Sequence, residues 1–288
     1  MPNIAYVNGK WSPLASAVIS VEDRGFQFGD GVYEVIRTYG GHIFHLDEHI
    51  KRLHESARLI QMALRETPAQ IEKIVRAGCK KSGYKNVKIY IQITRGIAPR
   101  LHPFPKGVRP TSVYTFRQLD PVPQTIQDKG VSVISINDIR WNKCHVKSLN
   151  LLPNVLAREG AIQSGAYEAI FVRDGRVWEG AGSNLFAVYG QEIVTPPAGA
   201  FLLSGITRDR VLTLGQKKGI VIREENIALL DLYKADEIFL TGTTVEILPV
   251  VRVDKKKIGS GKPGKVTSLL RQAFEEEIRL FPFYPRLR

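Results

Sequence analysis

Residues 141–154 read Trp141-Asn-Lys-Cys-His-Val-Lys147-Ser-Leu-Asn150-Leu-Leu-Pro153-Asn154, and the fold can be worked out from this stretch in both directions. Before it, residues 131–136 are rich in Val and Ile, which predicts a strand. After it, helical spacing begins at about residue 152, with Asn150 or a neighbour as the N-cap and Pro153 in the first turn. Lys147 is therefore expected on a loop that leads from a strand into a helix.

A lysine on such a loop can form a Schiff base with a carbonyl compound. Its pKa must first be lowered, by desolvation or by nearby cations. Arg140, Lys143 and His145 are the local candidates for those cations. Taken alone, Lys147 also fits an ordinary exposed surface lysine, so its role has to be decided by the rest of the chain.

The first part of the chain predicts an antiparallel sheet with helices packed on it. Asn8-Gly9 tolerates the positive φ angles of a tight hairpin turn. Thr67-Pro-Ala-Gln70 combines an N-cap, a first-turn proline and a capping-box glutamine, which together start a helix. The expected elements are strands at 4–7 and 10–11, a strand at 32–39 that returns through 42–44, helices at 46–62 and 67–83, and strands at 87–94 and 111–116.

The stretch Leu119-Asp-Pro-Val-Pro-Gln-Thr carries two closely spaced prolines, which resist both helix and sheet ladders. We expect it to connect two domains, a small N-terminal α/β domain at 1–119 and a larger C-terminal domain at 129–288, with the connection at 120–128. The second domain should hold the strand at 131–136, the helix from about 152, a hairpin turning at Asp174-Gly175, further strands, a helix after Gly205 and a closing helix at about 265–280. The fold class is α/β, in a two-domain α+β arrangement.

Length and composition fit a folded enzyme. A chain of 288 residues has room for two domains and a substantial core. The net charge of +13 suits acidic small molecules, nucleic acid or an anionic surface. Because the basic residues are scattered and no aromatic stripe accompanies them, acidic ligands are favoured and no nucleic-acid partner is expected.

Cysteine use and hydropathy indicate a cytoplasmic protein. The two cysteines, Cys79 and Cys144, lie far apart and form no C-x-x-C pair, so no disulfide is expected. No apolar run approaches membrane-spanning length, and the N-terminal residues lack the basic and apolar regions of a signal peptide.

Two motifs point to other chemistry and are set aside. Gly259-Ser-Gly-Lys-Pro-Gly264-Lys265-Val266-Thr267 nearly spells a phosphate-binding P-loop, but Val266 stands where a Ser or Thr must bind magnesium. A turn before a helix is therefore expected there. His45-Leu-Asp-Glu48-His49 matches the H-x-x-E-H pattern of zinc enzymes. Because His45 closes a strand, we expect an ordinary surface pair of histidines and no metal.

A resemblance that runs over nearly the whole chain decides the role of Lys147. The motifs are Phe28-Gly-Asp-Gly-Val-Tyr33-Glu-Val-Ile-Arg37, Glu48-His-Ile-Lys-Arg52-Leu, Lys147-Ser-Leu-Asn-Leu-Leu-Pro-Asn, Glu179-Gly-Ala-Gly-Ser-Asn, Gly205-Ile-Thr-Arg and Thr241-Gly-Thr-Thr. In this order they resemble the class IV aminotransferases of pyridoxal-phosphate fold type IV. That family includes D-amino-acid and branched-chain aminotransferases and aminodeoxychorismate lyase. The resemblance implies a small and a large domain joined by a loop, and a homodimer.

The resemblance also implies the cofactor site. Lys147 would hold pyridoxal 5'-phosphate as a Schiff base and then move the proton of the substrate. Glu179, expected just after a strand at 176–178, would keep the pyridine nitrogen protonated. The phosphate would lie at the helix N-terminus formed by Gly205, Ile206 and Thr207, where free N–H groups face an anion. Arg52 and Thr243 would complete the phosphate site, and Leu203 would pack on the ring.

Substrate choice depends on Pro99-Arg100-Leu101-His102-Pro103, an extended loop in which Arg100 and His102 share one face. This Arg-x-His resembles the D-amino-acid aminotransferases, where the pair comes from the partner subunit and binds the α-carboxylate together with the tyrosine that matches Tyr33. Arg37 shares the strand face of Tyr33 and could take the distal carboxylate of 2-oxoglutarate. Because Arg37 resembles the branched-chain group, an L-branched-chain aminotransferase stays open as the alternative, and the lyase is less favoured.

Overall fold

The computed structural model describes residues 3–281, and the chain in it divides into two units. The first unit ends at Asp120 and also takes in Val146–Asn150. The second unit holds Pro121–His145 and the residues from Leu151 onward. The lysine-bearing segment therefore belongs to the first unit, although it lies within the sequence of the second.

The first unit is built on an antiparallel sheet with the strand order β2-β1-β6-β5-β3-β4. The predicted hairpin at Asn8-Gly9 is confirmed, since Val7 pairs with Lys10 across it. The elements are β1 (Ile4–Val7), β2 (Lys10–Pro13), a short 3-10 helix (Leu14–Ser16), α1 (Arg24–Phe28), β3 (Gly31–Tyr39), β4 (His42–Ile43), α2 (Leu46–Leu59), α3 (Pro68–Ser82), β5 (Val87–Thr94) and β6 (Thr111–Gln118).

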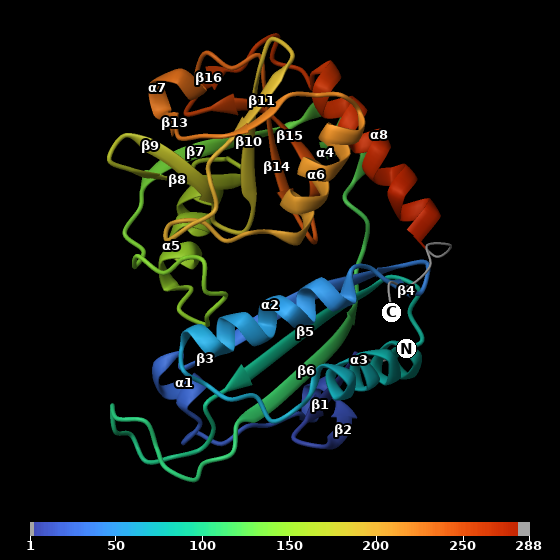
Figure 1. Ribbon diagram of the computed structural model, residues 1–288, viewed down its shortest axis with the longest axis vertical. Helices are drawn as coiled ribbons and strands as arrows, with labels where there is room; N and C mark the ends of the chain where they lie inside the picture. Colours follow the sequence, from blue (N-terminus) through green and yellow to red (C-terminus); the bar gives the residue numbers. More distant parts are fainter. Residues whose placement is uncertain (1–2, 282–288) are drawn as a thin grey trace. The chain divides into compact units, whose positions relative to one another are not determined.

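Alternation along β5 places the core of this unit on one face of its sheet. The apolar residues at every second position of β5 are fully buried, and they contact the apolar faces of α2 and α3. Both helices cover that face (Figure 1). The predicted capping box at the start of α3 is confirmed, because Thr67 and Gln70 exchange hydrogen bonds of 2.8 and 3.3 Å between side chain and backbone.

The segment Val146–Asn150 adds to the free edge of β3. The backbone N–H of Tyr33 donates to the carbonyl of Lys147 at 3.0 Å, and that of Leu149 donates to the carbonyl of Gly31 at 3.1 Å. Val32 and Ser148 form a bridge between these bonds. The backbone of Lys147 is thus held in place by a strand-like pairing with β3.

The second unit is a sheet whose strands close into a ring. The order β10-β14-β15-β7-β8-β9 returns to β10 through the pair Asn184 and Glu179. The elements are α4 (Gln124–Lys129), β7 (Val131–Asn137), α5 (Leu152–Gln163), β8 (Glu168–Arg173), β9 (Arg176–Gly180), β10 (Asn184–Tyr189), β11 (Glu192–Thr195), α6 (Ile206–Lys217), β12 (Ile222–Glu224), β13 (Ile227–Ala228), α7 (Leu229–Leu232), β14 (Glu237–Gly242), β15 (Glu246–Val253), β16 (Lys256–Lys257) and α8 (Lys265–Leu280). Helices α6 and α8 lie side by side (Figure 1).

One local prediction for this unit was wrong. The stretch 119–125 was expected to form no helix, but α4 begins at Gln124, directly after Pro123. A proline before the first turn costs no helical hydrogen bond, and Gln124 bonds Asp128 one turn on at 2.7 Å. At α5 the N-cap is Leu151, the neighbour of Asn150, and Pro153 lies in the first turn, as predicted.

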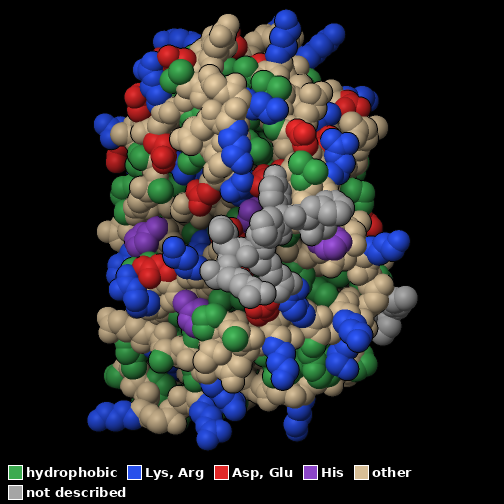
Figure 2. Space-filling model, turned by 45° about the vertical axis from the view of Figure 1, so that its right-hand side comes forward, with side chains coloured by type: hydrophobic (Ala, Val, Ile, Leu, Met, Phe, Trp, Pro, Cys, Tyr) green, Lys and Arg blue, Asp and Glu red, His purple; other side chains and the backbone are tan. Residues whose placement is uncertain are grey.

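Within the described residues, no helix combines the length and the apolar character needed to cross a membrane. Basic side chains are interspersed with acidic and apolar ones over the face of the molecule shown in Figure 2.

Candidate active site

Lys147 is half-buried, and its ammonium lies against an aromatic ring. Its Nζ is 4.3 Å from the ring centroid of Tyr33, and its backbone N–H donates to the hydroxyl of Ser56 at 3.2 Å. The predicted loop between strand and helix is confirmed, since Lys147 lies after β7 and before α5. The ring of Tyr33 provides an amine-binding surface of the kind that cations prefer.

Arg52 is held by an acid on the same unit. Its Nε and one terminal nitrogen donate to the two carboxylate oxygens of Glu34 at 2.7 and 2.9 Å. The same carboxylate is 2.7 Å from Nδ1 of His49. Burial alone would raise the pKa of Glu34, but the charge of Arg52 and the hydrogen bonds from His49 and Arg52 outweigh it and hold that pKa well below its usual range. Glu34 is therefore ionised and fixes the direction of the guanidinium.

The carboxylate of Glu179 accepts hydrogen bonds from three donors in the second unit. These are Arg140 at 2.5 Å, the side-chain amide of Asn184 at 3.2 Å and the backbone N–H of Leu203 at 3.1 Å. Glu179 was expected just after a strand and instead lies within β9, at the pair that closes the ring of strands. It is a buried acid, bonded to the guanidinium of Arg140, whose orientation the fold determines.

Arg140 has a role that the sequence did not indicate. Its guanidinium binds both oxygens of Asp138, at 2.9 and 3.1 Å, besides Glu179. Burial lowers the pKa of Arg140, but the hydrogen bond to Asp138 and the charge of Glu179 raise it by more. The net shift of this pKa is upward, so the group stays charged. Its charge is thus shared between two acids, and its proposed effect on Lys147 stays a prediction. Arg140 orients Glu179.

The N-terminus of α6 is an anion-binding candidate. Gly205 is its N-cap and has no side chain that could satisfy the first N–H groups, and Ile206 and Thr207 follow as predicted. A Cβ at position 205 would collide with the side-chain oxygen of Asn184, which explains the glycine. The amide of Asn184 also donates to the carbonyl of Leu203 at 2.8 Å, so the segment before the helix is fixed.

Thr243 directly follows β14, which brings it into the Thr-Gly-Thr-Thr turn. Near the end of β14, opposite Asn184, the hydroxyl of Thr241 is buried and has no hydrogen-bond partner among the described residues. A buried unsatisfied hydroxyl calls for a polar group that the protein chain does not supply. These donors fit a phosphate ester.

Arg100 and His102 lie against one aromatic ring on the first unit. The guanidinium of Arg100 is 4.5 Å from the ring centroid of Phe28, and the ring of His102 is 5.5 Å from it. Arg100 also donates to the carbonyl of Gln27 at 3.0 Å. The structure thus brings the two side chains to the same residue, as their shared face predicted.

Tyr33 and Arg37 occupy one face of β3. The rings of Tyr33 and Tyr90 lie 5.7 Å apart, and the guanidinium of Arg37 lies 4.0 Å above the ring of Tyr39. Arg37 is directly opposite Lys88 in the register of β3 and β5. Two cations at directly opposite positions repel each other, which favours a negative ligand on this face.

The two motifs that were set aside are occupied by other contacts. The two histidines were wrongly expected at the surface, since both are buried and His45 is the N-cap of α2. His45 bonds Glu48 at 2.9 Å, and His49 bonds Glu34. No group of three or more His, Cys, Asp or Glu side chains within residues 3–281 could hold a metal ion. At the P-loop-like turn, the N–H groups of Val266 and Thr267 donate to the carboxylate of Glu237 at 3.0 and 2.8 Å, so the start of α8 is capped by an acid.

The donor set fits pyridoxal phosphate, residue by residue. An acid that accepts bonds suits a protonated pyridine nitrogen, and an open helix start with a buried hydroxyl suits a phosphate. Sequence reasoning missed Glu34 and Asn184 and did not connect Arg140 with Glu179. Glu34 and Asn184 both lie in quoted motifs and could have been singled out from them. The link between Arg140 and Glu179 depends on a tertiary contact.

The family model described as "Amino-transferase class IV" matches residues 31–253. This chain belongs to the class IV aminotransferases, a family of pyridoxal-phosphate enzymes, with the α/β architecture of fold type IV.

Similar proteins agree with this family. The D-alanine aminotransferase of Bacillus licheniformis is 41% identical over 278 residues, which cover 94% of this chain and 95% of that protein. That of Staphylococcus haemolyticus is 39% identical, covering 95% of this chain and 97% of its own. Among solved structures, the branched-chain amino acid aminotransferase of Escherichia coli superposes with a TM-score of 0.89 at 28% identity, covering 96% of this chain and 94% of its own.

Proposed function

We propose that this protein transfers the amino group between a D-amino acid, such as D-alanine or D-glutamate, and a 2-oxo acid such as 2-oxoglutarate or pyruvate. The observation that carries this proposal is the Arg100–His102 pair, held on one ring, in a chain 41% identical to a D-alanine aminotransferase. The predicted domains at 1–119 and 129–288 remain part of the proposal, as the small and the large cofactor-binding domain of the family.

The cofactor, when bound, supplies the electron sink that lets the α-proton of an amino acid leave. Lys147 would bind its aldehyde carbon and carry the proton. Glu179 would favour a proton on the pyridine nitrogen, because its carboxylate is held in a fixed direction by three donors and places a negative charge beside the cation. The N–H groups of Ile206 and Thr207, the hydroxyl of Thr243 and the guanidinium of Arg52 would hold the phosphate, with Leu203 on the ring.

Arg100, His102 and Tyr33 would bind the α-carboxylate of the substrate. A guanidinium grips a carboxylate through two hydrogen bonds, and fixing that group decides which face of Cα presents its hydrogen to Lys147. This loop would therefore choose the stereochemistry. Arg37 would bind a distal carboxylate, which extends the range to D-glutamate and 2-oxoglutarate.

We further propose a homodimer in which Arg100 and His102 act on the partner subunit's substrate. Apolar side chains are exposed around their loop, among them Phe26 at 70% and Leu101 at 65%. The bridge between Asp23 and Ile97 brings these two segments together. Exposed apolar residues gathered on one surface mark a site of protein association. Free cysteines are consistent with a location in the cytoplasm.

Transamination of L-branched-chain amino acids is the second candidate. Arg37 favours it, as do the structural neighbours, which include branched-chain enzymes at 28% identity. The Arg-x-His pair gives the D-amino acids precedence, and aminodeoxychorismate lyase, which needs no such pair, comes last.

The test is a comparison of D-alanine, D-glutamate and L-leucine as donors to 2-oxoglutarate. Faster turnover of the two D-amino acids supports the proposal, and faster turnover of L-leucine overturns it in favour of the branched-chain enzyme.

A further inference from the structure

A buried arginine at the start of α1 binds the backbone of the Arg100–His102 loop. Arg24 is 3% exposed. Its two terminal nitrogens donate to the carbonyls of Leu101 and His102, the latter at 3.3 Å, and its Nε donates to the carboxylate of Asp30 at 2.8 Å. Every nitrogen of this guanidinium therefore binds an oxygen at the loop or at the turn before β3.

The position of Arg24 is unfavourable for a helix, so its presence needs another reason. A positive charge in the first turn opposes the helix dipole, and burying it adds a desolvation cost. Asp30 offsets both effects and is itself bound by Arg95 at 2.8 and 3.0 Å. Arg95 ties this acid to the carbonyls of Ile60 and Gln61, after α2.

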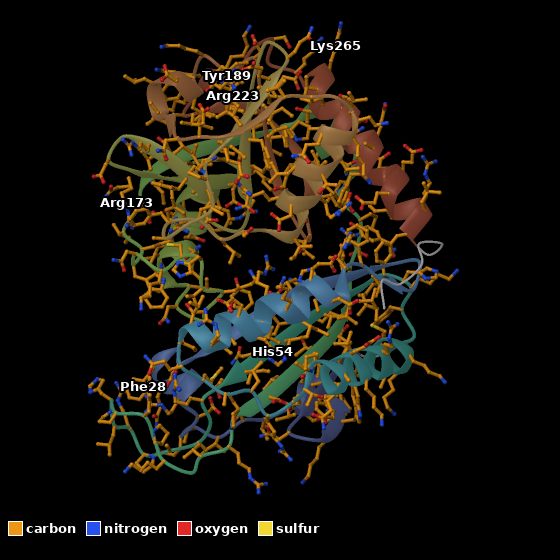
Figure 3. All side chains as sticks on the ribbon, viewed as in Figure 1. Phe28, His54, Arg173, Tyr189, Arg223 and Lys265 are labelled. Carbon is orange, nitrogen blue, oxygen red and sulfur yellow. The ribbon has the colours of Figure 1, made fainter. Side chains whose placement is uncertain are left out.

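The loop and α1 meet at a second point. Arg100 and His102 both lie against Phe28, the last residue of α1, which Figure 3 labels, and Arg100 donates to the carbonyl of Gln27. The side chains of the pair thus rest on the end of α1, while Arg24 at its start holds the carbonyls of Leu101 and His102. The backbone of the pair has little freedom to shift relative to α1.

We propose that Arg24 is a positioning residue that sets substrate affinity by fixing the backbone of the carboxylate-binding loop. The inference rests on the proposed role of Arg100. Asp30 takes part by orienting the guanidinium, since it accepts the Nε hydrogen of Arg24. A displacement of about 1 Å at a substrate-binding group is enough to reduce kcat/KM about a hundredfold.

The experiment uses the holoenzyme and the variants Arg24→Lys, Asp30→Asn and Arg100→Ala. Lysine keeps the charge of Arg24 but cannot bind two carbonyls and an acid together. We expect Arg24→Lys and Asp30→Asn to raise the KM for D-alanine about tenfold to a hundredfold, with kcat and cofactor content close to those of the wild type. Arg76→Lys on α3, an exposed arginine paired with Glu72, is the matched control and should change neither constant.

The double variant Arg24→Lys with Arg100→Ala separates positioning from general destabilisation. If Arg24 acts through Arg100, the KM of the double variant equals that of Arg100→Ala, because the group being positioned is already absent. Additive losses, or a fall in kcat alone, overturn the proposal. If Arg24→Lys does not fold, Asp30→Asn carries the same comparison. An unchanged KM in Arg100→Ala refutes the proposed function, whereas an effect of Arg100→Ala without one of Arg24→Lys and Asp30→Asn refutes only this inference.

Discussion

Glu34 and Arg52 form a two-bond ion pair in which Nε and one terminal nitrogen of the arginine bind opposite carboxylate oxygens, at 2.7 and 2.9 Å. The carboxylate is fully buried, and the arginine side chain is 14% exposed. Such a pair fixes both the position and the plane of the guanidinium. The proposed phosphate contact of Arg52 thus depends on the acid that orients its guanidinium.

Replacing Glu34 by glutamine should weaken cofactor binding. Glutamine keeps the shape of the side chain but loses the charge that orients Arg52, and the loss of bonds to a charged group should lower the free energy of unfolding by about 1.5 to 3 kcal/mol. We expect the Kd for pyridoxal phosphate to rise at least about tenfold. Titration of the apoenzyme measures the Kd, and urea unfolding measures stability. An unchanged Kd in a folded variant would separate Arg52 from the phosphate.

His49 makes stability depend on pH. Burial lowers the pKa of its ring from the ordinary value of 6.5, so the folded protein holds a neutral ring that donates from Nδ1 to Glu34. Below pH 6.5 the His49 ring binds a proton in the unfolded chain, whereas in the folded chain it stays neutral to a lower pH. The free energy of unfolding should therefore fall as the pH drops through this range, by up to about 1.4 kcal/mol per pH unit.

The measurement for His49 is urea unfolding at several pH values. His49→Gln should flatten the slope below the ordinary histidine pKa. His54→Gln is the control, because His54 is less buried and should contribute less to the slope. An equal slope in the wild type and in His49→Gln contradicts the assignment.

Arg37 should govern the choice of amino acceptor. Removing the guanidinium in Arg37→Leu takes away a charge-assisted contact to the distal carboxylate of 2-oxoglutarate, a loss of about 2 to 5 kcal/mol in kcat/KM for that substrate. Pyruvate has no distal carboxylate and should be used nearly as well as before. Steady-state assays with both acceptors decide the matter. Equal losses for both would place Arg37 outside the side-chain pocket.

The proposed exchange of Arg100 between subunits predicts complementation. Lys147→Ala should be almost inactive alone, and Arg100→Ala should be almost inactive at a D-alanine concentration far below its raised KM. In a mixed dimer, one site would combine both changes and the other would have neither, so random mixing should restore about a quarter of the wild-type activity. If Arg100 serves its own subunit, every site in the mixture lacks one group and the activity stays near zero. The measurement is the activity of the two variants after they are mixed, mildly unfolded and refolded together.

Local features of the fold could be predicted from the sequence, while contacts between distant segments could not. The capping box at Thr67 and Gln70 and the helix at Lys265–Leu280 lie where their own residues place them. The short helix after Pro123 was not predicted, because the two prolines indicated a loop and Gln124 alone did not indicate a helix. That Val146–Asn150 joins β3 is invisible in its sequence, since the pairing depends on the backbone of residues more than a hundred positions earlier.

The candidate site divides in the same way. Lys147, Glu179 and Gly205 could be found from motifs, because each motif has a chemical purpose of its own. The groups that orient them, such as Arg140 for Glu179, depend on tertiary contacts that periodicity and spacing do not encode. Arg140 was proposed to act on the pKa of Lys147 because the two residues are close in the sequence.

The central claim is that the amine of Lys147 holds the cofactor, and borohydride reduction followed by peptide mass analysis tests it most directly. Reduction should abolish the visible absorbance of the wild-type protein and leave a pyridoxyl group on the peptide that contains Lys147. Lys147→Ala should bind the cofactor without this covalent label. A label on another lysine, or a folded and cofactor-saturated wild-type protein without any label, would contradict the account.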